Sequence, residues 1–141
     1  MSSNLSTPSI ATPTDTARNS AELGGRVLLA ALFLLSGVGK IGAYAATAGY
    51  MASMGVPGVA LPLVIALEVL GAAAIMLGWR TRIVAFLLAG FTLVTGIVFH
   101  ADFGDQMQTV MFLKNVSISG AFLLLVAHGA GRYSLDARRA R

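Results

Sequence analysis

The sequence of 141 residues contains no cysteine and few charged residues. The lack of cysteine excludes disulfide exchange, iron–sulfur clusters and thiolate metal sites. Charged residues make up 11% of the chain, about half the share of a typical soluble domain. Hydrophobic residues account for 56% and occur in long blocks rather than in stripes. This composition predicts an integral membrane protein with a single domain.

Four apolar blocks have the length that a helix needs to cross a membrane, about 20 residues. They are residues 24–44, 59–78, 83–101 and 108–131. Because backbone polar groups must be satisfied internally in lipid, these spans are expected to be helical. The sequence therefore predicts an all-α integral membrane four-helix bundle over residues 23–134.

The segments outside the spans have a different composition. Residues 1–22 are rich in Ser, Thr, Pro and Ala and lack an apolar period, which predicts a disordered cytoplasmic tail. The first span is expected to act as an uncleaved anchor. Residues 45–58 are expected to hold a short interfacial helix between the first two spans. Residues 135–141 are expected to be a basic cytoplasmic tail.

The basic residues predict the orientation of the chain. An even number of spans places both termini on one side of the membrane. That side collects Arg18, Arg26, Arg80, Arg82, Arg132, Arg138, Arg139 and Arg141. The other side has near it only Lys40, Lys114, Asp102 and Asp105. The positive-inside rule therefore predicts a multi-pass protein of the bacterial inner membrane with both termini in the cytoplasm.

A single carboxylate, Glu68, interrupts the second apolar block. An isolated charge at mid-membrane costs about 2.5–3.5 kcal/mol on insertion scales, so Glu68 is expected to be protonated or paired with a cation. Measured from the flanking arginines, Lys40 lies about 21 Å and Glu68 about 18 Å along their helices. His100 and Lys114 lie about 27 Å along theirs. Lys40 is therefore the first candidate partner of Glu68, and Lys114 is the second.

Each span contributes a polar group in its outer half, which predicts a polar pocket open to the outer face. The candidate catalytic residues are Glu68, Lys40 and His100. The candidate ligand-binding residues are Lys114, Asn115, Ser36 and Ser117. Gly71 and Ala72, one turn beyond Glu68, are expected to leave room beside the carboxylate.

Structural alternatives exist for these polar residues. The Lys40–Glu68 pair can serve only to tie two helices together. His100 can carry protons, or it can be an interfacial histidine that contacts water or Asp102. His100 and His128 lie at opposite faces of the membrane, so they cannot ligate the same haem within one subunit. We expect no metal, no intrinsic cofactor and no nucleic-acid partner.

Several motifs occur in a recognisable order. They are "GRVLLAALFLLSGVGKI", "YMASMGVP", the Glu-x-x-Gly of the second span, the "GWRTR" turn, the histidine that closes the third span and the "FLKN" of the fourth. From about Gly24 to Asp136, the sequence resembles the DoxX family of small bacterial membrane proteins. The resemblance implies a four-helix inner-membrane protein whose relatives include subunits of membrane oxidoreductases, among them a thiosulfate:quinone oxidoreductase, and members tied to oxidative or sulfur stress. Lys40, Glu68, His100, Lys114 and Asn115 match the family's polar positions.

The leading hypothesis is a membrane subunit of a quinone-linked oxidoreductase system. Lys40 or Lys114 would donate to a quinone carbonyl, Glu68 and His100 would relay protons, and a redox partner enzyme would supply electrons. The alternative is a non-catalytic module that binds lipid or anchors a partner enzyme. Transport of a small anion is a weaker hypothesis, because four spans make a small transporter unless the chain forms a homo-oligomer.

Overall fold

The computed structural model describes residues 13–140, most of which are helical. The elements are α1 (Pro13–Gly42), α2 (Tyr44–Ser53), the 3₁₀ turn η1 (Gly58–Ala60), α3 (Leu61–Leu77), α4 (Thr81–His100), α5 (Gln106–His128) and α6 (Leu135–Arg139). Within this part of the chain, four helical segments are long and apolar enough to cross a membrane: α1, η1 with α3, α4, and α5. The predicted all-α fold with four spans is confirmed.

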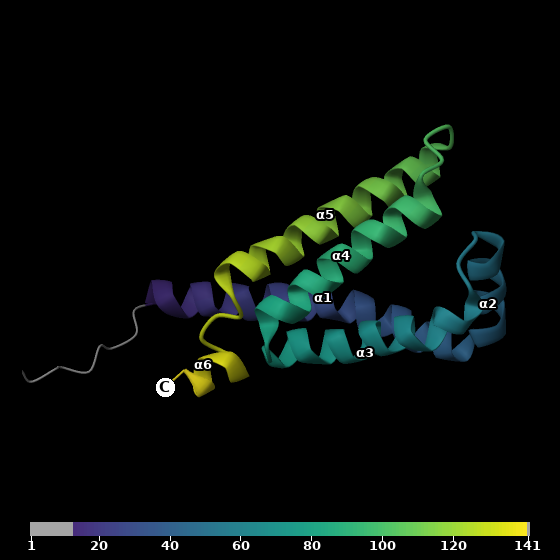
Figure 1. Cartoon of the computed structure of the whole chain (residues 1–141). Helices are drawn as coiled ribbons and strands as arrows, with labels where there is room; N and C mark the ends of the chain where they lie inside the picture. Colours follow the sequence, from purple (N-terminus) through teal and green to yellow (C-terminus); the bar gives the residue numbers. More distant parts are fainter. Residues whose placement is uncertain (1–12, 141) are drawn as a thin grey trace, which may run out of the picture.

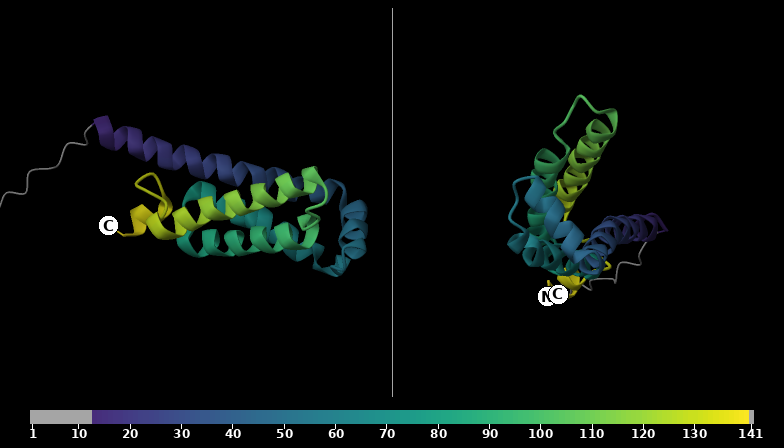
Figure 2. Two further views of the ribbon diagram at one scale, coloured as in Figure 1. Left: turned by 90° about the horizontal axis from the view of Figure 1, so that it is seen from above. Right: turned by 90° about the vertical axis from the view of Figure 1, so that its right-hand side faces the viewer.

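The four long helices pack as two antiparallel pairs, α1 with α3 and α4 with α5. Figure 1 shows the pairs converging near α6 and diverging toward α2 and the α4–α5 turn. The end-on view in Figure 2 shows the same separation. The bundle therefore has a closed end, where α6 lies, and a splayed end.

Small side chains explain why the pairs meet at the closed end. Alanines let helix backbones approach closely in a membrane protein, and the buried core contains four of them. The core consists of Ala30, Phe33, Ala72, Ile75, Ala85, Leu88, Ala89 and Phe122. Phe33 and Phe122 pack edge to face with ring centres 5.2 Å apart. All of these residues lie in the half of the spans nearer the closed end.

The prediction that Gly71 and Ala72 leave room beside the carboxylate of Glu68 is wrong. A Cβ atom on Gly71 would lie 3.2 Å from Leu88 of α4, and Ala72 is fully buried in the core. Gly71 thus allows α3 and α4 to touch. The sequence pattern showed small residues near the carboxylate, but a facing helix occupies the space that they leave.

The first helix begins earlier than the sequence predicts. Residues 1–12 of the expected tail lie outside the described residues, whereas residues 13–22 form the first turns of α1. Proline is compatible with the first helical position, and Arg18 pairs with Glu22 one turn later at 3.5 Å. A polar stretch without apolar periodicity can extend a helix that the span already nucleates, because propagation costs less than nucleation.

The expected short helix after the first span is present as α2. Figure 1 shows it running across the splayed end of the α1–α3 pair. It ends in a turn where Gly55 adopts a φ of +79°, a conformation that glycine accepts readily. The ring of Tyr50 stacks on Phe99 of α4 with centres 5.6 Å apart. This contact links α2 to the α4–α5 pair, whereas the placement of α2 in the membrane interface stays a prediction.

Candidate functional site

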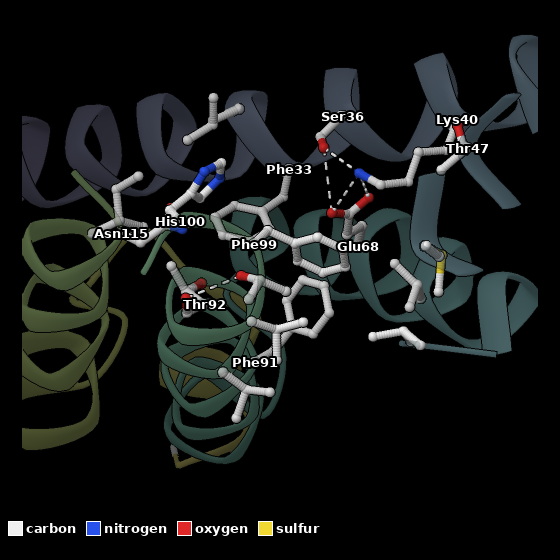
Figure 3. A pocket seen from close by; sticks show the side chains of 18 of the residues that line it. Phe33, Ser36, Lys40, Thr47, Glu68, Phe91, Thr92, Phe99, His100 and Asn115 are labelled. Carbon is white, nitrogen blue, oxygen red and sulfur yellow. Dashed lines mark hydrogen bonds and ion pairs between the residues drawn. The ribbon is translucent and has the colours of Figure 1, made fainter. Parts of the chain in front are cut away.

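A hydrogen-bonded cluster of Lys40, Glu68 and Ser36 joins α1 to α3 (Figure 3). Lys40 Nζ lies 2.9 Å from each carboxylate oxygen of Glu68 and donates to Ser36 Oγ at 2.6 Å. The Ser36 hydroxyl in turn donates to Glu68 Oε1 at 3.3 Å. Ser36 and Lys40 are one turn apart on α1, and the antiparallel α3 brings Glu68 opposite them. The predicted pairing of Glu68 with Lys40 is confirmed.

The two charges of this pair differ in exposure. The side chain of Glu68 is 5% exposed, and that of Lys40 is 25% exposed. A carboxylate that is nearly free of solvent needs a cation and hydrogen bonds to remain charged. Lys40 supplies the charge, and Ser36 adds a hydroxyl donor. Lys40 therefore lies on the more exposed side of the cluster, and it covers the buried carboxylate of Glu68.

Gly37 brings the two helices together at this cluster. A Cβ atom there would lie 2.7 Å from Val69 Cγ2 and 3.1 Å from Glu68 Cβ. Any larger side chain would force α1 away from α3. The close approach places Ser36 and Lys40, on either side of Gly37, within reach of the carboxylate.

A cavity of about 420 Å³ lies beside the cluster, between the two helix pairs. Apolar side chains form most of its wall, and they include four aromatic residues: Phe33, Tyr50, Phe91 and Phe99. Polar side chains reach it at only a few points. Predominantly apolar walls with a few converging polar groups are typical of sites that bind small molecules. The splay of the helix pairs therefore creates a candidate ligand site.

Helix α4 contributes a hydroxyl and an imidazole to the cavity. Thr92 Oγ1 donates to the carbonyl of Leu88 at 2.6 Å. His100 Nδ1 lies 2.8 Å from Gln108 Oε1 of α5, so this histidine pairs with an amide rather than with Asp102. Both His100 and Thr92 line the cavity.

Helix α5 carries two polar faces, and only the face of Asn115 and Ser119 packs inward. Asn115 lines the cavity, and Ser119, one turn further, is buried and donates to the carbonyl of Ala89 at 2.8 Å. Ser117 is exposed, bonds its own helix at Leu113 and does not line the cavity. The prediction that Ser117 helps to form the pocket is therefore wrong, because α5 carries two polar faces and the sequence does not say which one packs inward.

Lys114 borders the cavity without reaching Glu68. Its Nζ lies 3.4 Å from Met111 Sδ on the same helix, and Lys40 is the partner of the carboxylate. Lys114 lies on the outward side of α5, and its long side chain brings the charge to the cavity edge. A cation without a carboxylate partner thus remains beside the cavity, among the described residues.

The closed end holds residues whose roles the sequence analysis missed. Arg26, treated as a surface charge, is fully buried. Its guanidinium donates to the carbonyls of Ile75 at 3.2 Å and Met76 at 3.4 Å, and to the carbonyl of Tyr133. It therefore caps the C-terminus of α3 and holds the C-terminal segment. The position of Arg26 just inside the first apolar block is the sequence feature that could have indicated its burial.

Part of the segment predicted as a basic tail, residues 135–141, forms α6 (Leu135–Arg139) and docks against the start of α4. Asp136 accepts hydrogen bonds at 2.8 Å from the backbone N–H groups of Arg80 and Thr81, which have no partner within the first turn of α4. Burial alone would raise the pKa of Asp136, but the hydrogen bonds from Thr81 and Arg80 and the nearby Arg139 guanidinium outweigh it. The pKa of Asp136 therefore lies below its usual value of 3.8.

Docking of the C-terminal segment should depend on pH. A carboxyl whose pKa is lower in the folded state stabilises the fold above its unfolded pKa, and this contribution disappears as the pH falls through the folded pKa. We expect Asp136→Asn to unfold at a lower temperature than the parent protein at pH 7, with the difference shrinking below about pH 4. Thermal unfolding in detergent across this range tests the expectation. Asp102→Asn, in the loop at the splayed end, is the control and should show no such convergence.

The chain thus belongs to the class of small α-helical membrane proteins with four spans. The sequence profile of the DoxX family matches residues 21–101, and the chain is a member of this family. It is 51% identical over 114 residues to inner membrane protein YqjF of Escherichia coli K12, covering 81% of this chain and 88% of that protein. It is 40% identical over 120 residues to inner membrane protein YphA of the same organism, covering 80% and 86%. No solved structure matches the chain.

Proposed function

We propose that the cavity between the helix pairs binds the headgroup of a quinone or a similar ligand, and that the protein is a membrane subunit of a quinone-linked oxidoreductase system. One observation carries this proposal: a largely apolar cavity with four aromatic side chains in its wall lies between separated membrane helices, and it is also lined by Lys40 and the buried Glu68 that pairs with it. An aromatic ligand with polar ends suits such walls.

The polar groups lie on both helix pairs, which favours a ligand with two polar ends. Lys40 and Glu68 come from α1 and α3, whereas Asn115 and Lys114 come from α5. Lys40 contacts both Glu68 oxygens and Ser36. A carbonyl oxygen at this side therefore competes with Ser36 for Lys40. Asn115 and Lys114 offer donors at the other side.

Proton transfer requires groups at the inner and outer ends of the cavity. Glu68 lies at the inner end with little exposure, and His100 lies at the C-terminus of α4 toward the loop. We assign Glu68 to hold a proton beside the ligand and His100 to exchange protons with water. A bound quinone accepts two electrons and two protons, and the electrons come from a partner oxidoreductase.

Small molecules that co-purify with the protein test this proposal. Mass spectrometry of the protein purified in mild detergent should detect a stoichiometric quinone, and Glu68→Gln should lose it while its thermal unfolding still shows a folded protein. Asp102→Asn is the matched control, because it removes a carboxylate outside the cavity. Retention of quinone by Glu68→Gln at the parent level would contradict the assigned role of the carboxylate.

A second function is a non-catalytic membrane module that binds lipid or anchors a partner enzyme. It is favoured by the observation that Lys40 and Glu68 pair with one another beside Gly37, where α1 and α3 lie close together. Under this function, neutral residues at both positions lower stability or partner retention and leave quinone-dependent activity of the host membrane unchanged. Bulk phospholipid as the sole co-purifying molecule in both parent and Glu68→Gln would support it.

We also propose an inner-membrane location with both termini in the cytoplasm. The names of the two relatives support the location, and the gathering of arginines at the closed end supports the orientation. Because the chain lacks cysteine, a single introduced cysteine can report the side. A membrane-impermeant maleimide added to spheroplasts should label Asp102→Cys and spare Arg138→Cys. The reverse labelling pattern would overturn the orientation.

A further inference from the structure

A second cavity, of about 530 Å³, lies at the closed end, between the end of α3 and the C-terminal segment. Its apolar side includes Met76 and Leu77 of α3 and Leu135 of α6. Two guanidinium-bearing residues, Arg132 and Arg138, line it as well. Apolar and cationic surfaces therefore meet in one cavity, at the opposite end of the spans from the cavity beside Glu68.

The backbone around this second cavity is held in place from two directions. Arg26 donates to the carbonyl of Tyr133. Asp136 accepts from the backbone at the start of α4, and its own N–H donates to the carbonyl of Gly78 at 2.9 Å. Gly78 adopts a φ of +66°, and a Cβ atom there would collide with Arg26 and Ser134. Tight packing thus positions the segment that carries the two arginines.

The side chains of Arg132 and Arg138, in contrast, are exposed and have no hydrogen bond or ion pair with any residue of the described chain. Both guanidinium groups remain available to a ligand. An arginine guanidinium binds a phosphate with parallel N–H donors in a fixed geometry. The fold thus holds two free phosphate-binding side chains beside an apolar surface.

The position of the cavity favours a lipid as the occupant. It adjoins Leu77, the last residue of a span, and Trp79 follows two residues later with 40% exposure. Tryptophan is enriched where a span meets the headgroup layer. Basic pockets at this level bind anionic lipid headgroups. The acyl chains of a lipid need an apolar surface, and the cavity supplies one. A free phosphate ion would make no use of that surface.

We propose that the second cavity binds an anionic phospholipid of the adjacent leaflet. Arg132 and Arg138 contact the phosphate, and an acyl chain lies along Met76, Leu77 and Leu135. The two arginines lie on a segment anchored by Arg26 and Asp136, so they approach the headgroup from a fixed backbone. This site does not depend on quinone binding at the other end.

Native mass spectrometry of the full chain in mixed micelles tests the site, with phosphatidylglycerol and phosphatidylcholine as probes. We expect phosphatidylglycerol to bind at least about tenfold more tightly than phosphatidylcholine. The double variant Arg132→Gln, Arg138→Gln should lose this preference. The matched double variant Arg80→Gln, Arg139→Gln removes the same charge from exposed arginines outside the cavity and should keep it.

Three results would overturn the proposal. The first is equal binding of the two lipids by the parent protein. The second is equal loss of preference in the two double variants, which would indicate a diffuse charge effect rather than a site. The third is displacement of phosphatidylglycerol by inorganic phosphate at the same concentration, which would indicate a site for the free ion. The two cavity arginines have no partners within the described chain, so their double variant should fold like the parent. Arg139 lies near Asp136 and helps to lower its pKa, so thermal unfolding must also show that the Arg80→Gln, Arg139→Gln variant is folded under the conditions of the binding experiment.

Discussion

Arg26→Met should lower the free energy of unfolding by about 3 kcal/mol or more. Methionine replaces the apolar stem but leaves the carbonyls of Ile75, Met76 and Tyr133 without their donor. A buried polar group that loses its partner costs about 1–3 kcal/mol. The C-terminal segment also loses one of its anchors. Equilibrium unfolding in mixed micelles of mild and denaturing detergent measures the difference.

Arg82 provides the control for this substitution. It caps α5 by donating to the carbonyls of Val126 and Ala127 at 2.8 Å and 2.9 Å, but it is exposed. Water can replace an exposed donor, so Arg82→Met should cost less than about 1 kcal/mol. Equal losses for the two variants would show that burial of Arg26 does not determine its contribution.

Gly37→Leu should separate α1 from α3 and disrupt the Lys40–Glu68 pair. The leucine side chain would enter space that Val69 and the Cβ of Glu68 already occupy. Overpacking of this kind costs about 1–3 kcal/mol, and displacement of Lys40 leaves a buried carboxylate without its cation. Unfolding in mixed micelles should show a large loss of stability, and quinone retention should fall with it.

Gly39→Leu is the matched control for Gly37→Leu. Both glycines lie in the same helix, but a Cβ atom on Gly39 meets nothing within 4 Å. The added side chain should face lipid and leave both stability and quinone retention close to those of the parent. If Gly39→Leu were as damaging as Gly37→Leu, general helix effects rather than the α1–α3 contact would explain the loss.

The sequence predicted the spans and the principal ion pair because both depend on local information. Hydropathy predicts the spans, since each must match the membrane thickness. Depth along a helix follows from residue counting at a fixed rise, so Lys40 and Glu68 could be placed at a similar level. Their contact at 2.9 Å needed only that α1 and α3 be neighbours, as helices that follow one another along the chain usually are.

The errors at Ser117 and Gly71 concern helix rotation and helix neighbours. Helix α5 has polar residues on two faces, and packing against α4 turns the face of Asn115 and Ser119 inward. Gly71 lies against Leu88, because α3 contacts α4 in the closed half of the bundle. The residue pattern of a single helix does not predict how that helix is rotated about its axis. It also does not predict which other helix packs against it at a given position.

The sequence by itself determined the membrane class, the four spans, the family and the position of the polar groups along their helices, because hydropathy, the order of motifs and residue spacing can be read along each helix separately. Only the tertiary structure decided that the bundle splays at one end, that Arg26 is buried and that the C-terminal segment docks through Asp136. These features arise between helices, where small side chains allow contact in one half and larger polar and aromatic groups hold a cavity open in the other.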